Sequence, residues 1–163
     1  MIYSDIIKYF EKGEQGITEL LIKCQPEFES INDIQGRLKA NLITDDESLS
    51  EALSQLTGIY MYFEPIFEVS QAYKEIEEDR IYSAIRVAGE KGLEIYKDDV
   101  LNFEIPIKKI TDNILKSEAH RGVRTYIRVR NAFEGYVKAC DKGIASIQSL
   151  LKREQKDKYK PVE

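Results

Sequence analysis

The sequence is poor in the residues that carry most catalytic chemistry. Its 163 residues include one histidine, two cysteines, four prolines and nine glycines. The single histidine, His120, excludes a multi-histidine metal site and leaves little basis for a histidine-based triad. Neither of the glycine-rich phosphate loops, GxxxxGK[S/T] or GxGxxG, occurs in the chain. We therefore predict that the protein is not an enzyme and uses no cofactor and no metal.

Long apolar runs are also missing. No run approaches the roughly 18–20 apolar residues that a membrane-spanning helix needs. The first residues, MIYSDIIKYFEK, lack the basic segment and apolar core of a secretory signal. We therefore expect a protein without a membrane partner that works in the cytoplasm, or in the host cytoplasm if a phage encodes it. Cys24 and Cys140 have no CxxC spacing, and we expect two buried free thiols rather than a disulfide.

The residues that are abundant favour helices. A chain with few prolines and glycines and with 33% charged residues is typical of a mostly helical protein. Apolar residues recur at steps of three and four over two long stretches, about 49–87 and 107–153. We predict an all-α fold in which these two helices form a long antiparallel hairpin, preceded by short N-terminal helices. We expect one domain over 1–153 and a polar, disordered tail over 154–163.

Local signals mark the ends of these elements. Pro26 is expected at the start of a helix or at a kink, because proline has no amide hydrogen to donate. Ser48-x-x-Glu51 fits a capping box at the start of the first long helix. Pro65 falls inside that helix and predicts a kink or a short break. Between the two long helices, residues 103–106 are expected to be extended.

Charge is distributed unevenly along the chain. Residues 1–104 have a net charge of −12, whereas residues 105–163 hold 14 Lys+Arg against 7 Asp+Glu, a net charge of +7, and the two add up to the overall −5. The basic residues of the last helix form our candidate nucleic-acid-binding set: Lys116, Arg121, Arg124, Arg128, Arg130 and Lys138. In one continuous helix Arg121, Arg124 and Arg128 would share a face, since they stand at positions i, i+3 and i+7.

Single-stranded nucleic acids bind to basic tracks that are combined with aromatic stacking platforms. Tyr126 and Tyr136 are the candidates for stacking. An alternative remains open, in which both tyrosines pack in the core and the basic helix pairs with acidic residues of the 49–87 helix. Those acidic residues are Glu64, Glu68, Glu75, Glu77, Glu78 and Asp79. His120 is expected on the helix surface, in contact with solvent, rather than in a proton-transfer role.

The 49–87 helix carries an aromatic cluster of Tyr60, Tyr62, Phe63, Phe67, Tyr73 and Tyr82. An aromatic stripe of this kind usually belongs to the core. A single antiparallel hairpin cannot cover residues on every side of a helix, however, so the surplus predicts a homo-oligomer. The candidate oligomerisation residues are Phe63, Phe67, Ile144, Ile147 and Leu151.

Several short patterns along the two long helices suggest a family. They are Arg130-x-x-Phe133-Glu134-x-Tyr136, Ala139-Cys140-Asp141-x-Gly143-Ile144-x-x-Ile147-Gln148-Ser149-Leu150-Leu151-Lys152, Leu56-x-x-Ile59-Tyr60-x-Tyr62 and Lys74-x-x-x-Glu78-x-x-x-Tyr82. Over roughly residues 49–156 the chain resembles the UvsY-like recombination mediators of bacteriophages and similar small all-helical phage proteins. The N-terminal 45 residues lie outside this resemblance, and the net acidity of the chain departs from it.

The resemblance implies a non-enzymatic, oligomeric accessory protein that forms rings. Such a protein holds single-stranded DNA and helps a RecA-like recombinase displace the single-strand binding protein. The residues that would hold the strand are Lys116, Arg121, Arg124, Arg128 and Arg130. Binding would be electrostatic and would weaken strongly with salt.

The alternative function is a helical structural, assembly or adaptor protein, such as a virion component, that makes only protein–protein contacts. One structural feature separates the two hypotheses. A mediator requires the face between Arg121 and Arg130 to be exposed and without acidic partners, whereas a structural protein would neutralise it with Glu or Asp.

Overall fold

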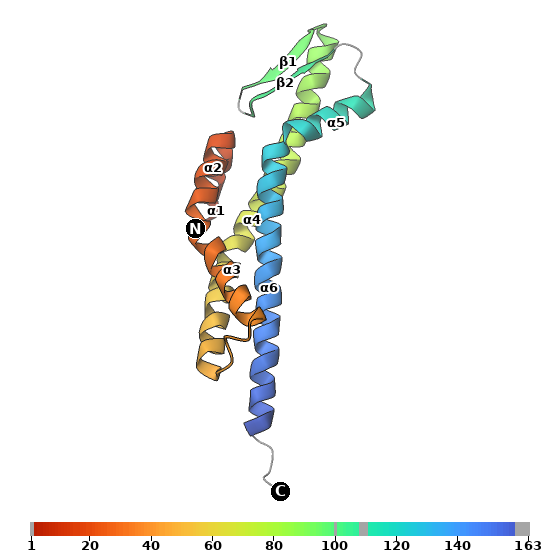
Figure 1. The fold of residues 1–163 in the computed structure, drawn as a ribbon. Coiled ribbons are helices and arrows are strands. Elements are labelled where there is room, and N and C mark those ends of the chain that lie inside the picture. Colours follow the sequence, from red (N-terminus) through yellow and green to blue (C-terminus); the bar gives the residue numbers. More distant parts are fainter. Residues whose placement is uncertain (1, 100, 108–110, 159–163) are drawn as a thin grey trace. The chain divides into compact units, whose positions relative to one another are not determined.

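The computed structural model describes residues 2–99, 101–107 and 111–158, with side chains through Arg153. Within these ranges the chain forms six helices and one two-stranded antiparallel hairpin (Figure 1). The elements are α1 (Tyr3–Glu11), α2 (Gly13–Lys23), α3 (Gln25–Lys39), α4 (Asp46–Glu90), β1 (Ile95–Asp98), β2 (Phe103–Pro106), α5 (Asp112–Gly122) and α6 (Arg124–Lys158). The predicted all-α class, with short N-terminal helices and two long ones, is confirmed. None of the described helices combines the length and apolar composition needed to cross a membrane.

The chain divides into two compact units, to which α4 and α6 both contribute. Unit 1 comprises Met1–Ile22 and Ile66–Ala132, and unit 2 comprises Lys23–Pro65 and Phe133–Glu163. The prediction of a single domain over 1–153 stays a prediction. The helix α6 extends through Lys158, beyond the predicted start of the tail, and residues 159–163 of that tail lie outside the described residues.

In unit 2, α4 begins at a different capping residue from the one we predicted. The Asp45 carboxylate accepts hydrogen bonds from the Ser48 amide nitrogen at 2.8 Å and from the Ser48 hydroxyl at 2.7 Å. Ser48 therefore lies in the first turn, and the predicted capping box that starts at Ser48 is wrong. The carboxylate of Asp45 reaches an otherwise unbonded amide of that turn, which is what a helix cap does. Pro26 lies in the first turn of α3, as expected.

The core of unit 2 is built on aromatic side chains that pack α3, α4 and α6 together. The ring of Phe28 lies 5.1 Å from that of Phe63, and Phe63 lies 5.2 Å from Phe133, measured between centroids. Nearby, a Cβ placed on Gly143 would lie only 2.6 Å from Cδ1 of Leu56. Glycine at this position lets α6 approach α4 closely, so the predicted packing of the two long helices is present here.

Pro65 does not interrupt α4, which runs without a break from Asp46 to Glu90. The predicted short break is therefore absent, and the other alternative, a kink, stays a prediction. The side chains on either side of the proline, Phe63 and Ile66, are both fully buried. Proline costs about 3 kcal/mol in a helix interior, and the burial of each of these apolar side chains contributes stability in the opposite direction.

Unit 1 contains an element that the sequence did not indicate. Residues 103–106 are extended, as predicted, but they pair with β1 in register Ile95↔Pro106 and Asp98↔Phe103. The hairpin is fastened to α4 through Asp98, whose side chain is only 4% exposed and lies 2.6 Å from Nη1 of Arg80. Its carboxylate also accepts hydrogen bonds from the Tyr96 hydroxyl and the Leu101 amide, each at 3.0 Å.

The predicted continuous helix over 107–153 is wrong, because the chain turns between α5 and α6 at Val123. Packing of Gly122 explains the turn. A Cβ on Gly122 would lie 2.8 Å from the Ile81 side chain on α4 and 3.2 Å from the Phe103 ring on β2. The backbone at Gly122 thus rests directly on α4 and the hairpin, and α6 starts in a new direction from there.

Candidate nucleic-acid interface

Arg124 and Arg128 occupy the first two turns of α6, in unit 1. Both side chains are exposed, and they share a helix face because they stand four residues apart. The opposite side of the same turns is buried through Tyr126 and Val129, each 1% exposed. Amphipathic packing therefore points the two arginines outward. Neither of them forms an ion pair with any residue in the part of the chain that the structure describes.

The two cations on α5 are exposed but already paired within their own helix. Nζ of Lys116 lies 3.1 Å from the Asp112 carboxylate, and Nη2 of Arg121 lies 2.6 Å from the Glu118 carboxylate. The Arg121 guanidinium also lies over the Phe103 ring, 5.6 Å from its centroid. Lys116 and Arg121 therefore contribute less positive charge to the surface than Arg124 and Arg128 do.

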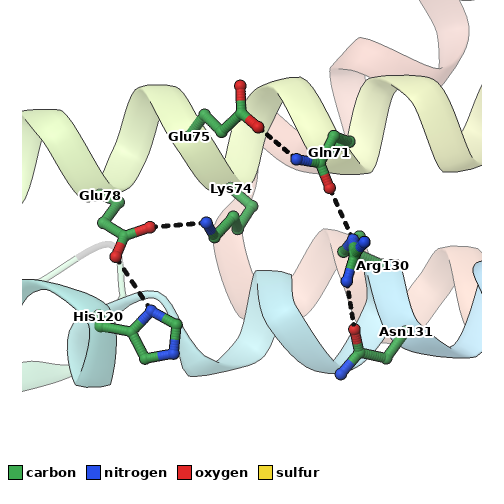
Figure 2. Close-up of polar contacts among 7 residues, drawn as sticks. All are labelled: Gln71, Lys74, Glu75, Glu78, His120, Arg130 and Asn131. Atoms are coloured by element: carbon green, nitrogen blue, oxygen red, sulfur yellow. Dashed lines mark hydrogen bonds and ion pairs between the residues drawn. The ribbon is translucent and has the colours of Figure 1, made fainter.

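Arg130 faces α4 rather than solvent (Figure 2). Its Nε donates a hydrogen bond to Oε1 of Gln71 at 2.6 Å, and its Nη1 donates to Asn131 at 2.9 Å. The guanidinium carbon lies 5.9 Å from the ring centroid of Phe67. Arg130 thus fastens α6 to α4, and we remove it from the nucleic-acid-binding set.

The acidic side chains of α4 bind partners other than the exposed arginines. Figure 2 shows that Gln71 donates a hydrogen bond to Glu75, while Glu78 lies 2.9 Å from Lys74 and 3.0 Å from His120. Partial burial alone would raise the pKa of Glu78, but the hydrogen bonds from Lys74 and His120 outweigh it and hold that pKa below its ordinary value.

Three further acidic residues of α4 also have partners other than the exposed arginines. Glu77 lies 2.6 Å from Arg80, Glu64 accepts from Tyr60 at 3.0 Å, and Glu68 accepts from Tyr3. Within the described residues, no acid of α4 forms an ion pair with Arg124 or Arg128. His120 is on the surface of α5, as predicted, where it faces Glu78. The predicted neutralisation of the basic helix by α4 is therefore absent at these two arginines.

Of the two candidate stacking residues, Tyr126 is buried and Tyr136 is half-buried. Tyr126 is 1% exposed, and its hydroxyl donates to the backbone oxygen of Phe10 at 3.1 Å. Burial raises the pKa of that hydroxyl. In unit 2, the ring of Tyr136 is stacked on Phe28 with centroids 4.2 Å apart. The stacking assignment is wrong for Tyr126, and one face of Tyr136 is already occupied.

Lys138 belongs to unit 2 and the other basic candidates belong to unit 1, so the predicted set is divided between the units. The Lys138 side chain is 67% exposed and lies 2.7 Å from Glu134. Two of the candidate oligomerisation residues, Phe63 and Ile147, are fully buried within unit 2 and cannot contact another copy. The other three, Phe67, Ile144 and Leu151, are half-buried.

A hollow of about 370 Å³ lies beside the α5–α6 turn. Arg121 and Arg124 line it, but so do Glu14 and Glu104. Equal numbers of basic and acidic side chains leave it without the excess positive charge that a phosphate would require. The candidate interface is therefore the outer face at Arg124 and Arg128, not this hollow.

Among the described residues, no group of three or more His, Cys, Asp or Glu side chains is arranged to hold a metal ion. Both cysteines are free and buried, as predicted. Comparison of the chain with protein-family models, with curated proteins and with solved structures finds no match.

Proposed function

We propose that this protein is a non-enzymatic single-stranded DNA-binding protein of the recombination-mediator type. It acts as an oligomer that assists the loading of a RecA-like recombinase. One observation carries the proposal: Arg124 and Arg128 are exposed on one helix face and form no ion pair with an acid among the described residues, although the chain as a whole is acidic. Guanidinium groups bind phosphate oxygens with two parallel hydrogen bonds, and an unpaired pair of them is suited to a nucleic-acid backbone.

The test is fluorescence anisotropy with a labelled oligothymidylate of about 25 nucleotides, long enough for a typical single-strand site. We expect micromolar or tighter binding at about 50 mM salt that weakens strongly at about 200 mM. In Arg124→Glu/Arg128→Glu the affinity should fall by more than about tenfold. The slope of log affinity against log salt should decrease by about 1.4, since each single-strand phosphate contact contributes about 0.7.

The matched control is Arg86→Glu/Lys97→Glu. Both side chains are exposed cations of unit 1, and each already lies near a carboxylate, Glu90 or Asp99. This variant changes the net charge by the same amount as the test variant. If the two variants weaken binding equally, the effect is general electrostatics and the assignment to Arg124 and Arg128 is wrong.

The rival function, a structural or adaptor protein, is favoured by a different observation. Unit 1 exposes large apolar side chains at the end of α4 and in the hairpin, with Leu93 at 53% and Ile95 at 54%. Such side chains suit protein contacts. If the folded wild-type protein binds no oligonucleotide at about 50 mM salt, the mediator proposal fails and this function takes its place.

A further inference from the structure

Unit 2 contains a second basic site, which lies between α3 and α6. It is a hollow of about 450 Å³, within the range of volumes that ligand sites occupy. Three lysines line it: Lys39 from α3, and Lys138 and Lys142 from α6. Lys39 and Lys142 are exposed and form no ion pair among the described residues. None of the described residues that line the hollow is acidic, in contrast to the hollow beside the α5–α6 turn.

The backbone and the polar side chains give this hollow a defined floor. Gly135 and Ala139 stand four residues apart on α6 and share one helix face. Because both residues are small, the backbone of α6 is accessible from the hollow at this face. A Cβ on Gly135 would meet nothing within 4 Å. Nε2 of Gln35 donates a hydrogen bond to the backbone oxygen of Ala139 at 3.1 Å and joins α3 to α6 there. The hydroxyl of Ser146 adds a neutral donor to the lining.

We infer that this hollow is a phosphate-binding site that holds backbone phosphates of a single nucleic-acid strand. Lys39 and Lys142 supply the unpaired positive charge for phosphate oxygens, whereas Lys138 already lies 2.7 Å from Glu134. The small residues Gly135 and Ala139 let a phosphodiester approach α6 without a steric barrier. The three lysines do not read base identity, so binding here is independent of sequence. The inference rests on the proposed function and adds Lys39 and Lys142 to the residues that contact the strand.

The hollow can be blocked without removing any lysine. Gly135→Glu places a carboxylate in the open space, and glutamate is a better helix former than glycine, so the fold should be retained. Gly58→Glu is the matched control, because Gly58 is also an exposed glycine in a helix of unit 2 with open space at its Cβ. We expect Gly135→Glu to weaken binding of labelled oligothymidylate by about tenfold, and Gly58→Glu to change it less than about twofold.

A second variant, Lys39→Ala/Lys142→Ala, tests the charge itself. It should decrease the slope of log affinity against log salt by about 1.4, two single-strand contacts at about 0.7 each. Circular dichroism on every variant checks that the helices are retained. The inference is overturned if Gly135→Glu and the lysine variant both bind like wild type while Arg124→Glu/Arg128→Glu binds weakly, which leaves the proposed function intact.

The opposite result is also informative. Loss of binding in the hollow variants with no loss in Arg124→Glu/Arg128→Glu would support the inference and remove the arginines from the interface. Failure of wild-type protein to bind the oligonucleotide overturns both proposals. Equilibrium dialysis with thymidine 5′-monophosphate tests whether the hollow binds a free mononucleotide instead of a strand. If the wild-type protein retains this mononucleotide and the hollow variants keep their affinity for the oligonucleotide, the site binds a free phosphate compound. That result would overturn the assignment to a nucleic-acid strand.

Discussion

The buried carboxylate of Asp98 should contribute measurably to the stability of unit 1, and Asp98→Asn tests this. Asparagine has the same shape and can still accept the hydrogen bond from the Leu101 amide. Its amide nitrogen, however, replaces the oxygen that accepts from the Tyr96 hydroxyl and pairs with Arg80. In the variant the amide nitrogen, a donor, faces the Tyr96 hydroxyl and the Arg80 guanidinium, which are also donors, at a side chain that is only 4% exposed.

The magnitude follows from these partners. Loss of a hydrogen bond to a charged group costs about 1.5–3 kcal/mol, and loss of a neutral one about 1 kcal/mol. Arg80 is 41% exposed and keeps its second partner, Glu77, so solvent and that contact reduce the penalty. We expect the free energy of unfolding to fall by about 2 kcal/mol, which lowers the urea midpoint by about 1 M at a typical slope.

The neighbouring residue provides the control. Asp99 has the same side chain, but it is 86% exposed and lies 3.6 Å from Lys97. Asp99→Asn should change stability by less than about 0.5 kcal/mol. Hydrogen exchange of the Leu101 amide should quicken only in Asp98→Asn. Equal unfolding free energies for the two variants at pH 7 would refute the argument that Asp98 fastens the hairpin to α4.

The same group predicts a pH dependence. Burial alone would raise the pKa of Asp98, but hydrogen bonds from Arg80, the Leu101 amide and Tyr96 outweigh it and hold the pKa below its ordinary value. A carboxyl whose pKa is lowered on folding stabilises the protein above its unfolded pKa, about 3.9, and loses this contribution as the pH falls. The difference between wild type and Asp98→Asn should be constant from about pH 5 to 8 and shrink below about pH 4.

Three further predictions concern packing. Gly122→Ala should lower the free energy of unfolding by about 1–3 kcal/mol, because its Cβ would crowd α4 and the hairpin. Gly135→Ala should raise the free energy of unfolding by about 0.5–1 kcal/mol. Equal shifts in the urea midpoint would contradict both expectations. Tyr126→Phe should lower the free energy of unfolding by about 1 kcal/mol, because the backbone oxygen of Phe10 loses its hydrogen-bond donor. An unchanged urea midpoint would mean that this hydrogen bond is not formed. Burial raises the pKa of the Cys24 and Cys140 thiols to about 11. Ellman's reagent should therefore label neither cysteine in the native protein and both cysteines in urea. Rapid labelling of the native protein would show that unit 2 opens readily.

Helical periodicity determined much of this fold. Apolar residues at steps of three and four predicted the long helix α4, most of α6 and the packing of the two, because that spacing creates a stripe that needs a partner. The same spacing did not indicate the division between α5 and α6. The scarcity of glycine and proline predicted the all-α class. The sequence left open whether the face of Arg124 and Arg128 is exposed. The structure decided it, because Tyr126 and Val129 on the other side of the same turns are buried.

The details of the site depended on contacts between residues far apart in the sequence. The turn at Val123 arises because Gly122 rests on Ile81 and Phe103, and no local signal specifies such a contact. Arg130 looked like its basic neighbours, but its partner is Gln71, 59 residues away along the chain. The sequence therefore identified the basic side chains and predicted that they lie on helices. The pairing of Lys116 and Arg121 within α5 follows from local spacing. Only the tertiary structure decided that Arg130 contacts α4, because that contact depends on what packs opposite it.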